Sequence, residues 1–132
     1  METRILIVIL ALWFLFMVIA IINAITREAV YRPVVGELAA HQVSTFIFVA
    51  LILSVTYLTF RSLDVRLKAS DALLTGSIWL VMTVAFEFIA GHYIFGNPWE
   101  KLLADYNILK GRVWSLVLLT TFVAPYITSR LV

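Results

Sequence analysis

An unbroken run of eighteen apolar residues near the start of the chain, Ile5 to Ile22, limits what this sequence can fold into. A helix needs about 20 such residues, within a range of about 17 to 25, to cross the hydrocarbon core of a bilayer. A secretory signal peptide has an apolar segment of only about 7–15 residues, followed by a small-residue cleavage motif. No convincing motif of that kind follows Asn23. The run therefore predicts a transmembrane helix.

The overall composition also favours a membrane location. Hydrophobic residues make up 63% and charged residues 14% of the 132 residues, whereas soluble domains have roughly 45–50% and 25%. About a third of the unfolded chain's surface stays exposed in a soluble domain of this size, so this much apolar surface could not be hidden. The same composition excludes intrinsic disorder. We therefore expect an integral membrane protein.

Three further uncharged stretches predict three more spans: Val43–Phe60, Ala72–Phe86 and Val113–Ser129. The third span of the four reaches full length only if it carries Glu87 inside the membrane. Each span should be helical, because lipid offers no partners for backbone N–H and C=O groups. The sequence predicts one all-α membrane domain over residues 1–132, an up-and-down bundle with transmembrane helices near 4–27, 37–62, 70–94 and 108–131 and a short interfacial helix at 98–106.

The connections between these spans bear on topology. They are short, which favours antiparallel neighbours. Pro33 and Gly36 predict that no continuous helix runs through the first connection, Arg27 to Gly36. The ten cations divide five and five between the two membrane faces, so the positive-inside rule does not orient the chain. Three cations between Arg61 and Lys68 favour cytoplasmic termini. Cations spread in this way are membrane anchors, so we expect no nucleic-acid partner.

Polar and ionisable residues gather at one membrane face, at the ends of all four predicted helices. Both histidines of the chain fall on this face. Its aromatic residues, such as Tyr106 and Trp114, are interpreted as an interfacial belt. The candidates for a substrate- or ion-binding site are Glu87, Arg27, Asn23, His41, His92 and Arg112.

Glu87 is the strongest single signal, since a carboxylate within a membrane is costly and normally faces the bundle and its partners. One interpretation is structural: an ion pair with Arg27 or Arg112 that holds the helices together. The functional interpretations are a proton or cation site, a polar substrate pocket, and a catalytic acid. Glu87 and His92 are five residues apart, about 140° around a helix, which counts against an acid–base pair.

His41 and His92 raise the alternative of a haem or metal site, because imidazole is a common ligand for both. Two histidines at a wet membrane boundary are more typical of hydrogen-bonding residues, so no cofactor is predicted. The sequence contains no cysteine, which excludes disulfides and thiolate ligands.

Family resemblance gives limited help with function. Small multidrug exporters have a similar length and one membrane carboxylate, but theirs lies in the first helix, which here has no acid in its apolar run. The chain resembles a group of small, uncharacterised bacterial inner-membrane proteins in four motifs: Phe86-Glu87-Phe88, Gly91-His92-Tyr93, Asp105-Tyr106-Asn107 and Gly111-Arg112-Val113-Trp114. The resemblance implies a bacterial inner membrane and a four-helix fold, and it implies no activity.

Three classes of function therefore remain open. The first is a transport or permeation component with a polar site around Glu87. The second is an accessory subunit whose polar cluster only packs helices together. The third is an enzyme acting on an interfacial lipid, or a haem- or metal-binding bundle. The expected partners are membrane lipids and either further copies of the chain or a larger membrane complex, because a four-helix chain has little interior volume.

Overall fold

The computed structural model describes residues 1–104, 106, 107, 109 and 111–132, and the regular elements in these ranges are all helices. Three helical segments are long and apolar enough to cross a membrane: Thr3–Val35, Glu37–Ser62 and Ala69–Ile94. The fourth apolar helix, α6 (Ser115–Leu131), has 17 residues. At 1.5 Å per residue it is about 26 Å long, a little short of the roughly 30 Å hydrocarbon core.

The predicted break in the first connection occurs at Gly36 but not at Pro33. Helix α1 (Thr3–Thr26) continues through a π-helical turn, η1 (Arg27–Tyr31), into α2 (Arg32–Val35). Pro33 lies in the first turn of α2, where proline is tolerated because an N–H is not required. Gly36 ends the helix with a φ of 88°, a conformation that costs glycine little.

The second and third predicted helices agree closely with the structure. Helix α3 (Glu37–Ser62) has the predicted bounds, and Glu37 lies in its first turn, where the helix dipole favours an acid. Helix α4 (Ala69–Ile89) continues as the π-helical turn η2 (Ala90–Ile94). Together they cover the predicted span at residues 70–94.

The last helix begins later than the predicted residue 108. Residues 108 and 110 lie outside the described residues, and residues 111–114 are not helical. Gly111 has a φ of 81°, its carbonyl accepts a bond of 2.9 Å from Gln42 Nε2, and the Val113 N–H donates to His41 Nε2 over 3.2 Å. Contacts with α3 therefore hold this segment outside the helix.

The short helix α5 (Trp99–Ala104) lies within the predicted interfacial segment at 98–106. Residue 105 of that segment is outside the described residues, and Tyr106 lies in a turn. Leu102 is buried whereas Leu103 is exposed. The helix therefore exists where the sequence predicts it, but it is shorter.

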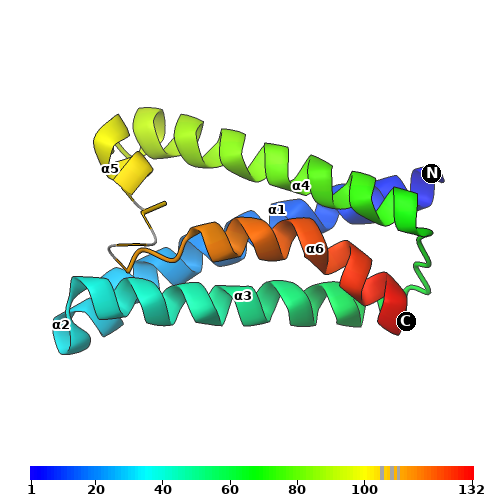
Figure 1. Ribbon diagram of the computed structural model, residues 1–132, viewed down its shortest axis with the longest axis horizontal. Helices are drawn as coiled ribbons and strands as arrows, with labels where there is room; N and C mark the ends of the chain where they lie inside the picture. Colours follow the sequence, from blue (N-terminus) through cyan, green and yellow to red (C-terminus); the bar gives the residue numbers. More distant parts are fainter. Residues whose placement is uncertain (105, 108, 110) are drawn as a thin grey trace.

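Both termini lie at one end of the molecule, and α2 and α5 lie at the other end (Figure 1). Near the termini the helices pack closely: Trp79 is fully buried, packs edge-on against Phe16 at 5.2 Å and donates to the Ile9 carbonyl over 3.0 Å. Gly76 lets α4 approach α6, since a Cβ at this position would collide with the carbonyl of Phe122. Toward the opposite end α4 diverges from α1 and α3 (Figure 1).

Candidate functional site

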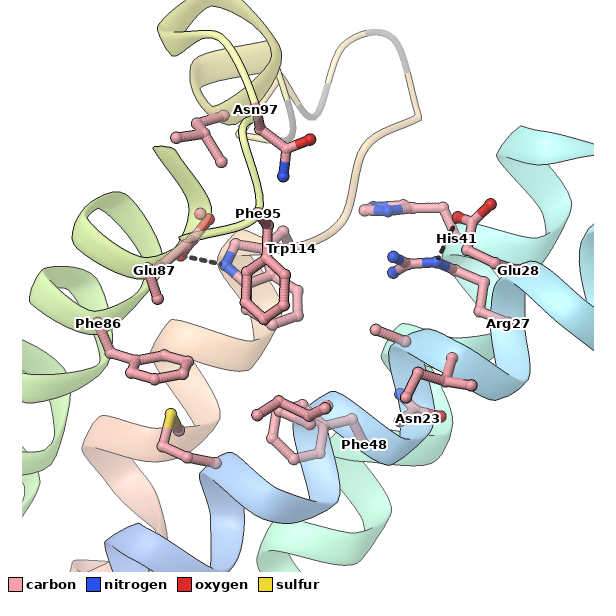
Figure 2. A pocket seen from close by; sticks show the side chains of 18 of the residues that line it. Asn23, Arg27, Glu28, His41, Phe48, Phe86, Glu87, Phe95, Asn97 and Trp114 are labelled. Carbon is pink, nitrogen blue, oxygen red and sulfur yellow. Dashed lines mark hydrogen bonds and ion pairs between the residues drawn. The ribbon is translucent and has the colours of Figure 1, made fainter. Parts of the chain in front are cut away.

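A cavity of about 710 Å³ lies at the end of the bundle that carries α2 and α5 (Figure 2). Residues of α1, η1, α3, α4, η2 and α5 line it, together with Trp114 just before α6. Its volume is within the range of roughly 300–1,000 Å³ typical of small-molecule sites. Along the first helical segment its lining runs from Met17 to Ala29, a rise of roughly 18 Å. The cavity is therefore long, and it follows the direction of the membrane-length helices.

The deep part of the cavity is apolar and closed. Met17, Phe48 and Phe86 line it, and Phe48 stacks on Trp114 with ring centroids 6.2 Å apart. Thr83, which also lines the cavity, accepts a hydrogen bond of 3.1 Å from the Trp13 indole. Trp13 is buried and belongs to the packed core, so this pair lies where the cavity adjoins the packed half of the bundle.

Glu87 lies on the α4 wall of the cavity and is half-buried. Its Oε2 accepts a hydrogen bond of 2.6 Å from Trp114 Nε1 and one of 2.7 Å from the Tyr106 hydroxyl. Both aromatic residues were predicted to belong to an interfacial belt, and their bonds to Glu87 were not predicted. The indole N–H and the phenol O–H are the features that could have indicated this contact from the sequence, because buried Trp and Tyr normally find a hydrogen-bond partner.

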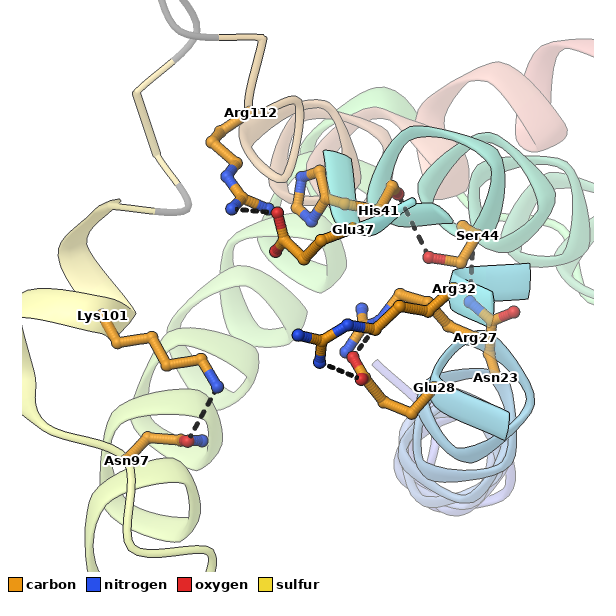
Figure 3. Close-up of polar contacts among 10 residues, drawn as sticks. All are labelled: Asn23, Arg27, Glu28, Arg32, Glu37, His41, Ser44, Asn97, Lys101 and Arg112. Carbon is orange, nitrogen blue, oxygen red and sulfur yellow. Dashed lines mark hydrogen bonds and ion pairs between the residues drawn. The ribbon is translucent and has the colours of Figure 1, made fainter. Parts of the chain in front are cut away.

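The two arginines proposed as partners of Glu87 form ion pairs with other carboxylates. Arg27 lines the cavity and lies 3.3 Å from Glu28, which Arg32 also approaches to 2.7 Å. Arg112 pairs with Glu37 at 2.7 Å and so connects the 111–114 segment to the start of α3 (Figure 3). The Arg112–Glu37 pair joins segments that are distant in sequence and so contributes to holding this end of the bundle together, whereas the Glu28 pairs are local to one continuous helix.

The two histidines are held by different elements. His41 is 4% exposed, lines the cavity and accepts the Val113 N–H at Nε2. His92 shares a hydrogen bond of 2.9 Å with the Asn97 carbonyl and stacks on Trp99 at 3.8 Å. Among the residues that the structure describes, no three His, Asp or Glu side chains are grouped so that they could hold a metal ion.

Asn23 connects α1 to α3, since its amide donates to the Ser44 carbonyl over 2.8 Å, and it also lines the cavity. The structure thus brings four of the six sequence candidates to one cavity. Lys101 and Asn97 line the same cavity and were missed. Lys101 reaches the side-chain oxygen of Asn97, at 3.3 Å, across one turn (Figure 3). Because both belong to the connection before α6, sequence spacing alone did not place them there.

Comparisons of the chain with protein-family models, with curated proteins and with solved structures find no match. The function therefore has to be inferred from the cavity and the residues that line it.

Proposed function

We propose that this chain is a four-span protein of the bacterial inner membrane that binds a small molecule in the cavity around Glu87 and acts as a component of a transport or permeation system. The observation that carries the proposal is the convergence of Glu87, Arg27, Asn23 and His41 on one cavity of about 710 Å³. Large cavities that are mostly apolar, with a few convergent polar groups, are typical of ligand sites.

The proposal places the ligand site in one half of the bundle. The cavity lies near α2 and α5, and the half of the bundle near the termini is filled by side chains such as Trp79 and Phe16, which are at most 1% exposed. A ligand would enter from one side, and passage to the other side would require the packed half to open. With cytoplasmic termini, as proposed from the cations between Arg61 and Lys68, the cavity would be on the periplasmic half of the membrane.

A structural role is the second candidate, and the hydrogen bonds of Glu87 favour it. By holding Trp114 and Tyr106, Glu87 fixes the segment before α6 against α4. In that case the chain would serve as an accessory subunit, either in a complex or as several copies. The two candidates differ in whether the cavity holds a ligand.

Filling the cavity tests the proposal without knowledge of the ligand. Ala24 lines the cavity on α1, whereas Ala11 lies on the exposed face of the same helix. We expect Ala24→Trp to place an indole in the cavity, and Ala11→Trp serves as the matched control. Both variants and the unchanged protein are purified from membranes in lipid nanodiscs, and the retained small molecules are identified by mass spectrometry.

We expect one molecule to co-purify with the unchanged protein and with the control variant Ala11→Trp. The same molecule should be absent from purified Ala24→Trp. The same set of molecules in all three samples would contradict the proposed ligand site and leave the structural role.

A further inference from the structure

We infer that the ligand of this cavity is an amphiphile with an anionic headgroup, which enters sideways from one leaflet of the membrane. The inference rests on the proposed function and specifies the chemical class of its ligand. Three features support it: the gradient of polarity along the cavity, an apolar opening at its side, and the charge at its polar end.

The cavity changes from apolar to polar along its length. Met17 and Phe86 line the deep part, whereas Arg27, Asn97 and Lys101 line the end near α5. The lining along α1 extends for roughly 18 Å, which is close to the thickness of one leaflet's hydrocarbon, about 15 Å. A molecule with one polar end and an apolar chain of leaflet length matches this gradient.

The side of the cavity is continuous with the surface that faces lipid. Ile21 and Ile25 on α1 and Phe95 after η2 all line the cavity, and they are 37%, 63% and 58% exposed. Exposed apolar residues on a membrane-length helix contact acyl chains, because the bilayer core contains no water. A ligand with an acyl chain could therefore enter from the bilayer between Ile25 and Phe95 without leaving lipid.

The polar end of the cavity favours an anion. Arg27 and Arg32 share Glu28, and Lys101 donates to the neutral amide oxygen of Asn97. Of the charged residues that line the cavity in the described part of the chain, Arg27 and Lys101 are cations and Glu28 and Glu87 are carboxylates. Because Glu28 is shared between Arg27 and Arg32, which is not a lining residue, the Arg27 wall keeps a net positive charge. Arginine and lysine bind carboxylates and phosphates through charge-assisted hydrogen bonds.

Glu87 is also part of the cavity lining, but it is separated from Arg27. Figure 2 shows Glu87 and Arg27 on opposite walls, and Oε2 of Glu87 accepts two hydrogen bonds from the protein, from Trp114 and Tyr106. The anionic headgroup therefore belongs between Arg27 and Lys101, with the apolar chain passing toward Phe86 and Met17.

Photolabelling tests the place and the chemistry of binding. The full chain is reconstituted in phosphatidylcholine vesicles with diazirine-bearing palmitic acid or with the matching diazirine-bearing hexadecanol, and labelled peptides are mapped by mass spectrometry. We expect the acid to label the cavity face of α1 around Ile21 and Ile25. Unlabelled palmitate should compete, and the label should be lost in Ala24→Trp and kept in Ala11→Trp.

Charge removal tests the headgroup. In the double variant Arg27→Gln with Lys101→Gln, the concentration of the acid probe that gives half-maximal labelling should rise at least roughly tenfold, because charge-assisted hydrogen bonds to the headgroup are lost. Labelling by the alcohol should not change. The matched control, Lys68→Gln with Arg130→Gln, removes two cations near the termini. If the first variant does not fold, Lys101→Gln alone is used, because Lys101 lies on the exposed side of α5.

The outcomes separate this inference from the proposed function. Equal labelling of the cavity by acid and alcohol, with no effect of charge removal, would overturn the anionic headgroup. A further outcome is that neither probe labels the cavity although the co-purification experiment still shows a molecule that is lost in Ala24→Trp. That result would keep the proposed ligand site and contradict the inference that its ligand is an anionic amphiphile. A diazirine-bearing lysophosphatidic acid in a parallel sample shows whether the site prefers a phosphate or a carboxylate.

Discussion

Replacing Glu87 by alanine should destabilise the protein, and replacing it by glutamine should do so less. The carboxylate accepts two short hydrogen bonds, from Trp114 Nε1 at 2.6 Å and from the Tyr106 hydroxyl at 2.7 Å. A hydrogen bond to a charged group contributes about 1.5–3 kcal/mol, and hydrogen bonds inside membranes average only about 0.6 kcal/mol. These two bonds together should therefore contribute between about 1 and 6 kcal/mol to the free energy of unfolding.

Glutamine at position 87 keeps an acceptor oxygen but removes the charge. We expect Glu87→Gln to lower the free energy of unfolding by about 1 kcal/mol, because neutral hydrogen bonds are roughly half as strong as charge-assisted ones. Glu87→Ala leaves both donors without this acceptor, and we expect a loss of about 2–4 kcal/mol. Glu100→Gln is the control, because Glu100 is an exposed carboxylate on α5.

The assay is reversible unfolding of the protein in mixed micelles with increasing denaturing detergent, followed by circular dichroism. A double-mutant cycle of Glu87→Gln with Trp114→Phe isolates the pair, and the coupling energy should be about 1 kcal/mol. If Glu87→Ala unfolds at the same detergent fraction as the unchanged protein, the assigned hydrogen bonds do not stabilise the fold. If stability is kept while the co-purifying ligand is lost, Glu87 acts on the ligand and not on packing.

Three further predictions test the topology, the packing and the histidines. Because the chain has no cysteine, Arg66→Cys and Glu100→Cys should react with a membrane-impermeant maleimide from opposite faces of inverted vesicles; labelling from one face would contradict the four-span topology. Gly76→Ala should lower the free energy of unfolding by about 1–3 kcal/mol through overpacking against the Phe122 carbonyl. Ser77→Ala at the half-buried neighbouring position, whose hydroxyl bonds to the Leu73 carbonyl of its own helix, should change it much less in the same unfolding assay. The purified protein should show no Soret band, since His41 Nε2 already accepts the Val113 N–H; a band that His41→Ala removes would refute this.

The sequence by itself determined which helices are long and apolar enough to cross a membrane. Apolar runs such as Ile5 to Ile22 allow only structures that satisfy their own backbone hydrogen bonds in lipid, and a helix does this within one segment. The bounds of α3, Glu37–Ser62, follow from the same local pattern. The sequence also predicted that ionisable residues gather toward one end of the bundle, because the position of a residue along a long helix fixes its position along the bundle axis.

Local signals did not determine how the ends of these helices behave. Pro33 is a helix breaker in most contexts, but here it falls in the first turn after a π-helical turn and the helix continues to Val35. The late start of α6 depends on bonds from His41 and Gln42 to residues 111–113. Such partners are about 70 residues away in sequence, so no short window contains them.

Only the tertiary structure decided what surrounds Glu87. The sequence shows a carboxylate that must be satisfied, but it does not show which of the nearby donors reaches it, and the partners proved to include Trp114 and Tyr106. The cavity itself exists because α4 packs tightly on α6 at Gly76 and diverges from α1 further along (Figure 1). An empty volume is a property of the angle between helices, and that angle is set by side-chain packing along their whole length.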